Sequence, residues 1–293
     1  MSGSDSGLMA QGGHLQRALP GLSAWVEHFD TTPIPVLARS ALALEDLRPA
    51  EDSVDAHLLG ETFANDPLMV LKVLIRVAQL RRGREGSDAE TLTAALVMLG
   101  ITPFFRDFGP QRAAEEELVS VPGALDGFLA VLSRAHRASR FALAFAAQRL
   151  DHDAAVIHDA ALLHDFAELL MWLRAPTLMR EVVQRLEGDR SLRSAVVQRT
   201  VLNVELPDLQ HALMVRWRLP RLLIDISDDH REGSSVQARN VILAIRFARH
   251  TARGWDNPAM ADDVRDIAAL LNMAPEPTTV LLRDVEQSGT AFA

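Results

Sequence analysis

The feature that most restricts the fold of this chain is the spacing of its apolar residues, which recur every three or four positions along almost its whole length. The stretch from Leu68 to Val77 is an example, with further apolar side chains at Leu71, Val73 and Leu74. This period matches one face of an α-helix, whereas the strict alternation of a half-buried strand is nearly missing. We therefore predict an all-α protein, a helical bundle with an N-terminal helical subdomain.

The net charge and the cysteine count exclude several kinds of partner and site. Asp and Glu outnumber Lys and Arg by 39 to 30, which gives a formal charge of −9 and argues against a broad nucleic-acid surface, because phosphates need a cationic field. The chain has no cysteine, and hence no disulfide, thiolate metal site or cysteine nucleophile. No apolar run approaches the roughly 20 residues that span a bilayer, and the N-terminus lacks the features of a signal peptide. We expect a cytoplasmic protein that binds neither nucleic acid nor membrane.

Proline and glycine residues divide the chain into segments. Pro33 and Pro35 end a first amphipathic helix that we predict over residues 15–29, because two prolines so close together cannot continue a helix. A second boundary lies near residues 110–122, between Gly109-Pro110 and Pro122-Gly123. We predict four parts: a disordered leader with the short first helix (1–32), an N-terminal helical subdomain (33–120), a second helical subdomain (121–250) and a C-terminal helical extension (251–293).

A histidine next to an aspartate is the candidate functional feature. The dipeptide occurs three times, and the copy at His164-Asp165 differs from the others because it follows the apolar run 160–163. We predict that this pair lies inside an apolar helix over residues 154–173. Burying an imidazole and a carboxylate there costs free energy unless a partner pairs with them. That partner is either a divalent metal ion, for which the pair offers one nitrogen and one oxygen ligand, or an ion pair or hydrogen bond in the core.

Several segments in a fixed order resemble the HD superfamily of metal-dependent phosphohydrolases, and more closely its HDOD branch, the HD-related output domains of bacterial signalling proteins. The matching segments are Pro35-Val36-Leu37, Asn65-Asp66-Pro67-Leu68-Met69, Ala94-Ala95-Leu96-Val97-Met98-Leu99-Gly100, Ala160-Ala161-Leu162-Leu163-His164-Asp165-Phe166-Ala167 and Trp217-Arg218-Leu219-Pro220. The resemblance covers roughly residues 33–250. It implies an HD-domain-like helical bundle, with the HD-like part at residues 121–250.

The resemblance also implies a metal site that this chain has partly lost. The family-matched positions, as candidate but vestigial metal ligands, are His136, His164, Asp165, His211 and His230. Active HD enzymes also need a late aspartate, and the matching position here is Ile245 or Arg246, neither of which can ligate a cation. We expect Arg246 to pair with Asp165 instead. We expect no catalytic residue and no cofactor, with a residual divalent metal ion as the alternative.

Three functions remain open. The first is a non-catalytic bacterial signalling module that acts through contact with a signalling protein partner. The second is a metal-dependent phosphohydrolase for nucleotides or cyclic dinucleotides, with a ligand set rebuilt from Asp225, Asp229 or His230. The third is a ligand-sensing module with a small molecule in the cleft. The missing late carboxylate favours the first, because a metal that activates water must be held by enough negative charge.

Overall fold

The computed structural model describes residues 13–81, 89–189, 191–226 and 235–290, and within these ranges the chain folds into α-helices and one short 3-10 helix. The all-α fold predicted from the apolar spacing is therefore confirmed. The disordered leader predicted over residues 1–13 lies outside the described residues, apart from Gly13. Among the described helices, none combines the length and the apolar character that a membrane span requires.

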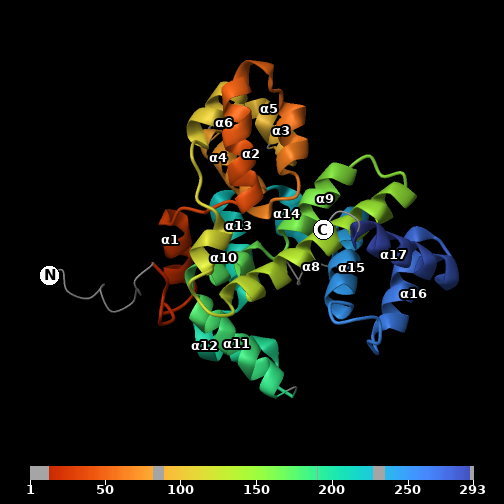
Figure 1. The fold of residues 1–293 in the computed structure, drawn as a ribbon. Helices are drawn as coiled ribbons and strands as arrows, with labels where there is room; N and C mark the ends of the chain where they lie inside the picture. The colour runs from red at the N-terminus through yellow and green to blue at the C-terminus, as the bar shows by residue number, and fades with distance from the viewer. Residues whose placement is uncertain (1–12, 82–88, 190, 227–234, 291–293) are drawn as a thin grey trace.

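The N-terminal lobe is a group of short helices that lie together at the top of Figure 1. Its elements are α2 (Ala38–Leu47), η1 (Arg48–Ser53), α3 (Ala56–Phe63), α4 (Pro67–Leu80), α5 (Leu92–Leu99) and α6 (Ile101–Asp107). Phe63 and Phe104 are completely buried in its centre, with their ring centroids 5.9 Å apart. Phe108 also packs on Phe104, with the ring centroids 5.2 Å apart. These aromatic contacts give the lobe a core of its own.

The rest of the chain is organised around one long helix, α8 (Ala124–Gln148), which crosses the middle of the molecule in Figure 1. It packs against α9, α10, α11, α15 and α17. The other elements are α1 (Leu22–Thr31), α7 (Ala114–Leu118), α9 (Ala154–Leu163), α10 (Phe166–Arg174), α11 (Pro176–Gly188), α12 (Ser194–Leu202), α13 (Leu206–Trp217), α14 (Arg221–Ile226), α15 (Val236–His250), α16 (Met260–Leu271) and α17 (Pro275–Thr290).

The first helix begins later than the sequence predicted. We predicted a helix over residues 15–29, but α1 starts at Leu22, because Pro20 precedes it and Gly21 has a φ of 127° that a helix does not allow. Leu15 instead donates its backbone N–H to the carbonyl of Arg174. In α1 the indole of Trp25 is fully buried and donates to the Leu202 carbonyl at 2.8 Å.

Two chain crossings connect the N-terminal lobe to the rest, and we call these segments, residues 33–37 and 109–114, the neck. They lie side by side, because the backbone of Val36 bonds to Arg112 and Ala114. Lys72 of α4 joins both crossings, since its ammonium donates to the Ile34 carbonyl at 2.5 Å and to the Gln111 side chain. The lobe is thus held to the body by a cation in addition to apolar contacts.

A buried aspartate positions the start of α4 beneath the neck. Asp66 is 1% exposed, and one of its carboxylate oxygens accepts the N–H groups of Leu68 and Met69, so that it caps α4. Its other oxygen accepts the N–H of Leu37 in the neck at 2.8 Å. Burial raises the pKa of Asp66 despite these hydrogen bonds. The Asn65-Asp66-Pro67 segment therefore ties the neck to α4.

One close helix contact depends on a glycine. A Cβ atom on Gly127 of α8 would lie 2.2 Å from the ring of Trp172 in α10, which is closer than nonbonded atoms come. We predict that Gly127→Ala lowers the free energy of unfolding by about 1–3 kcal/mol, because the indole has to move within a packed core.

The control for this substitution is Gly188→Ala, at the end of α11, where an added methyl group meets no atom within 4 Å. Alanine is the better helix former, so we expect that this variant keeps or slightly raises stability. Chemical denaturation of both variants measures the difference. Equal stability of the two would show that Trp172 does not rest on Gly127.

Lys72 gives a second prediction, because it is the only lysine in a chain without tyrosine or cysteine. Burial lowers the pKa of Lys72 to about 8, against the attraction of Asp66 and Glu117. Between pH 8 and about 10.4, the ordinary lysine pKa, the unfolded chain therefore binds more protons than the folded one. We expect the free energy of unfolding to rise over this interval by up to about 3 kcal/mol.

Denaturation of the wild-type protein and of Lys72→Met between pH 7.5 and about 10.5 measures this effect. The methionine variant cannot titrate, so its stability should stay flat while that of the wild type rises. A flat wild-type profile would mean that Lys72 keeps its ordinary pKa in the folded protein.

Candidate functional site

The His164-Asp165 pair lies at a break between two helices. We predicted one continuous helix over residues 154–173, but α9 ends at Leu163 and α10 begins at Phe166. Asp165 has φ −106° and ψ 24°, and its carbonyl accepts the N–H groups of Glu168 and Leu169 as α10 starts. The pair thus occupies a corner of the backbone, from which both side chains can turn to one side.

A glutamine from another helix satisfies the backbone at this corner. Gln210 of α13 is 6% exposed, and its side-chain oxygen accepts the N–H of Ala167 at 2.9 Å. Its amide nitrogen donates to the carbonyls of Leu163 and His164. The polar groups left over by the helix break are therefore paired inside the protein, as buried backbone groups need to be.

The Asp165 carboxylate is held by two arginines and a histidine. One oxygen accepts from Arg134 Nε of α8 at 2.8 Å, and the other accepts from an Arg249 amino group of α15 at 2.6 Å. His164 Nδ1 lies 3.0 Å from that second oxygen. Burial alone would raise the pKa of Asp165, but the charge of Arg249, the hydrogen bond from His164 and the charge of Arg134 hold it well below its ordinary value. The carboxylate is therefore ionised and fully paired.

Glu168 forms the second carboxylate of the site. It lies one helical turn after Asp165 and accepts from the same guanidinium, with Arg134 Nη2 at 2.5 Å from its oxygen. Burial raises the pKa of Glu168, and the nearby charge of Asp165 adds to this increase, against the attraction of Arg134. One arginine thus serves two carboxylates that differ in how readily they take up a proton.

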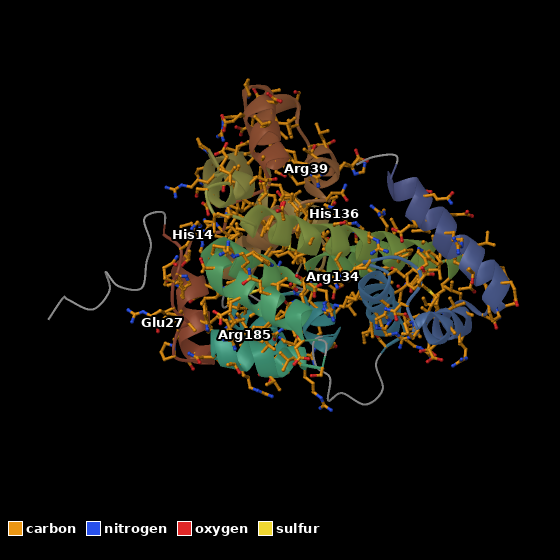
Figure 2. The ribbon with its side chains drawn as sticks, turned by 60° about the horizontal axis from the view of Figure 1, so that its bottom comes forward. His14, Glu27, Arg39, Arg134, His136 and Arg185 are labelled. Carbon is orange, nitrogen blue, oxygen red and sulfur yellow. The ribbon has the colours of Figure 1, made fainter. Side chains whose placement is uncertain are left out.

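The structure does not bring the predicted metal ligands together. His136 lies on the Arg39 side of α8, away from Arg134 (Figure 2), and its Nε2 bonds to the Asn65 carbonyl at 2.7 Å. His211 follows Gln210 on α13 but does not line the cavity beside Asp165. His230 lies outside the described residues.

Within the described ranges, no group of three or more His, Cys, Asp or Glu side chains is arranged to hold a metal ion. Of the alternative ligands, Asp225 lies in α14 with Arg221 at 3.5 Å, and Asp229 falls in the undescribed segment. The residues around Asp165 do not fit the metal that the HD resemblance implies, because two guanidinium groups already bind the carboxylate oxygens that would ligate it.

The predicted contact between Arg246 and Asp165 is wrong. Arg246 points to α16 instead, where its Nε lies 2.7 Å from Asp263 and an amino group donates to Asp266 at 2.6 Å. Arg249, three residues further along α15, takes the contact with Asp165. The prediction named the right helix and the right chemistry, but it missed the residue by three positions, which are about 4.5 Å along the helix axis and about 60° around it.

A cavity of about 710 Å³ opens beside the pair. His164, Asp165, Glu168 and Arg134 line one end, and Arg249 stands at the same end. The remaining walls come from α11, α12, the start of α13 and α15, and they are lined by Met179, Val182, Val183, Leu186, Ser194, Ala195, Gln198, Glu205, Leu206, Pro207, Gln210, Ile242, Ile245, Arg246 and His250. The site is thus a pocket with a charged end and a largely aliphatic body.

Comparisons with known proteins agree with this architecture. A family model described as HDOD domain matches residues 34–232, more than half of the chain. The MmoQ response regulator from Methylococcus capsulatus has a TM-score of 0.59 at 19% identity, with 82% of this chain and 98% of that chain covered. A virulence factor (cj0248) from Campylobacter jejuni has a TM-score of 0.61 at 15% identity, with 91% and 98% covered. Such identities show a shared fold. A search of curated proteins found no match.

The stability of the site should depend on the charge of Asp165. We predict that Asp165→Asn lowers the free energy of unfolding at pH 7 by about 3 kcal/mol, because it removes the buried carboxylate that pairs with the partly buried guanidinium of Arg134. The difference in free energy of unfolding between the wild type and Asp165→Asn should have its full value above about pH 3.9, the ordinary aspartate pKa. It should become smaller as the pH falls towards the lowered pKa of Asp165.

Urea denaturation of both proteins at several pH values between 7 and 3 measures this difference in free energy of unfolding. Asp262→Asn is the matched control, because Asp262 is 69% exposed and its ion pair with Arg265 lies on the surface. Exposed ion pairs contribute little, so this variant should stay close to the wild type. A loss in Asp165→Asn that does not change with pH would contradict the assigned ionisation.

Proposed function

The chain belongs to the HDOD domain family, and we propose that it is a non-catalytic regulatory module that relays a signal through contact with a partner protein. The formal charge of −9 supports a protein rather than a nucleic acid as the partner. The name response regulator, which the similar Methylococcus protein carries, agrees with a signalling role.

The observation that carries this proposal is the pairing of Asp165 with Arg134 and Arg249. Hydrolases of the HD type need a metal to lower the pKa of water and to neutralise the phosphate. A divalent cation would meet two guanidinium groups at 2.8 and 2.6 Å from the carboxylate that should ligate it. Like charges at such distances repel strongly in a partly buried site. The same carboxylate here joins three helices.

The alternative of a phosphohydrolase with a rebuilt ligand set has less support. It would draw on Asp225, Asp229 and His230, of which only Asp225 is described, and Asp225 already faces Arg221 in its own helix. No observation among the described residues directs these groups towards His164.

Two measurements on one sample test the proposal. We expect that the purified protein retains no stoichiometric Mn, Fe or Zn by elemental analysis, and that it does not turn over bis-p-nitrophenyl phosphate, nucleoside monophosphates or cyclic dinucleotides when Mn²⁺ or Mg²⁺ is added. His164→Ala is the control. Turnover by the wild type that disappears in His164→Ala would make the protein an enzyme and end the proposal, whereas equal traces in both would point to a contaminant.

A further inference from the structure

The cavity beside Asp165 has the size and the surface of a binding site for a small organic molecule. Its volume of about 710 Å³ lies within the range of ligand pockets. Val182, Val183 and Leu186 of α11 line it, as do Ile242 and Ile245 of α15. Figure 1 shows that α11 and α15 lie in different parts of the body, on either side of the region below α8. The walls are therefore aliphatic side chains from separate helices.

One cation at the charged end has hydrogen-bonding capacity left. A guanidinium carries five N–H donors, and within the described part of the chain Arg249 makes a single hydrogen bond, to Asp165. Its side chain is 49% exposed and lines the cavity. Arg134 is already shared by Asp165 and Glu168, and Arg246 is held by two aspartates of α16. Arg249 is thus the donor that a ligand in the cavity can reach.

The other lining groups restrict the charge of such a ligand. Asp165, Glu168 and Glu205 also line the cavity, and they repel a group with several negative charges, such as a diphosphate. A single negative charge can be matched by Arg249 alone. The site therefore favours a monoanion.

The walls also restrict the body of the ligand. Apart from the imidazoles of His164 and His250, the described lining residues carry no aromatic ring. Nucleobases are usually held by stacking on aromatic side chains, and this cavity offers no Phe or Trp for that purpose among its described lining. An alkyl chain gains as much from aliphatic walls as from aromatic ones, because burial of apolar area is not directional. The body that fits is aliphatic.

We propose that this cavity binds a small amphipathic monoanion, a medium-chain alkyl carboxylate, whose carboxylate is bound by Arg249 and whose chain lies between α11 and α15. The inference deepens the proposed function, because it gives the regulatory module an input, and it rests on the absence of a catalytic role for this end of the cleft. The ligand carboxylate can share Arg249 or replace Asp165 as its partner. In either case Asp165 keeps Arg134 and His164, so the buried charge is not left alone.

Calorimetric titration of the full chain with decanoate, below its micelle concentration, tests the proposal, with decanol as the neutral probe of equal chain length. We expect that decanoate binds to the wild type about tenfold or more tightly than decanol, because a charge-assisted hydrogen bond is lost with the alcohol. In Arg249→Gln the two probes should bind with similar, weak affinity. Arg253→Gln is the matched control, since Arg253 is 79% exposed and pairs with Glu187 instead of Asp165.

A second variant keeps the test independent of the ion pair. Val183→Trp fills part of the aliphatic body without a change of charge, and we expect that it weakens decanoate and decanol alike by about tenfold or more. Melting temperatures of each variant show whether it is folded. Equal binding of both probes to the wild type, or decanoate binding that survives Arg249→Gln, would overturn the proposal. So would tight binding of AMP that is lost in Arg249→Gln, since it would assign the cavity to nucleotides.

The two proposals fail in different ways. A protein that hydrolyses phosphodiesters through His164 loses the regulatory assignment, whatever binds in the cavity. A protein that neither hydrolyses phosphodiesters nor distinguishes decanoate from decanol keeps the regulatory assignment and loses only the ligand. The hydrolysis assay and the titration are therefore read separately.

Discussion

The paired charges of Arg134, Asp165 and Arg249 are the interaction on which the arrangement of the body depends. They join α8, α10 and α15, three helices that meet around the cavity and are far apart in the sequence. A buried carboxylate is costly without a partner and acceptable with two. In a metal-dependent hydrolase a divalent cation would neutralise such a charge. Here the protein's own arginines do so, and the same carboxylate becomes a structural link.

This link lies where the chain breaks between α9 and α10. Asp165 directly precedes α10 and meets Arg134 and Arg249 there, while His164 Nδ1 lies 3.0 Å from its carboxylate. The His158-Asp159 pair inside α9 has the same 3.0 Å spacing, so the two arginines, and not the contact within the pair, distinguish this corner. Gln210 stabilises the corner, because it forms hydrogen bonds with backbone groups that the helix break leaves without intrahelical partners. The helix break thus brings together the end of the pocket, the ion pairs of Asp165 and the hydrogen bonds of Gln210.

The part of the fold and of the site that could be predicted depends on how far apart along the sequence the interacting residues lie. The all-α fold could be predicted from the apolar spacing and is observed, because helical periodicity is a local signal. The HDOD family and the His164-Asp165 pair could be recognised from motifs. Arg134 and Arg249 could not, since they lie 31 and 84 residues from Asp165 and meet it only through helix crossing. The sequence motif pointed to Arg246 of α15 as the partner of Asp165, whereas the observed partner is Arg249, three residues further on.

The neck gives this molecule an unusual chemical property. Lys72 is the only lysine, and its amine is engaged by Ile34 and Gln111 where the lobe joins the body. An acylating reagent aimed at amines therefore has two targets in the chain, the N-terminus and this one side chain. Because both hydrogen bonds of Lys72 go to the neck, opening of the neck should raise the rate at which this partly buried amine is modified. The other residues counted with lysine as basic are arginines, which such a reagent does not target, so the signal of Lys72 has to be separated only from that of the N-terminal amine.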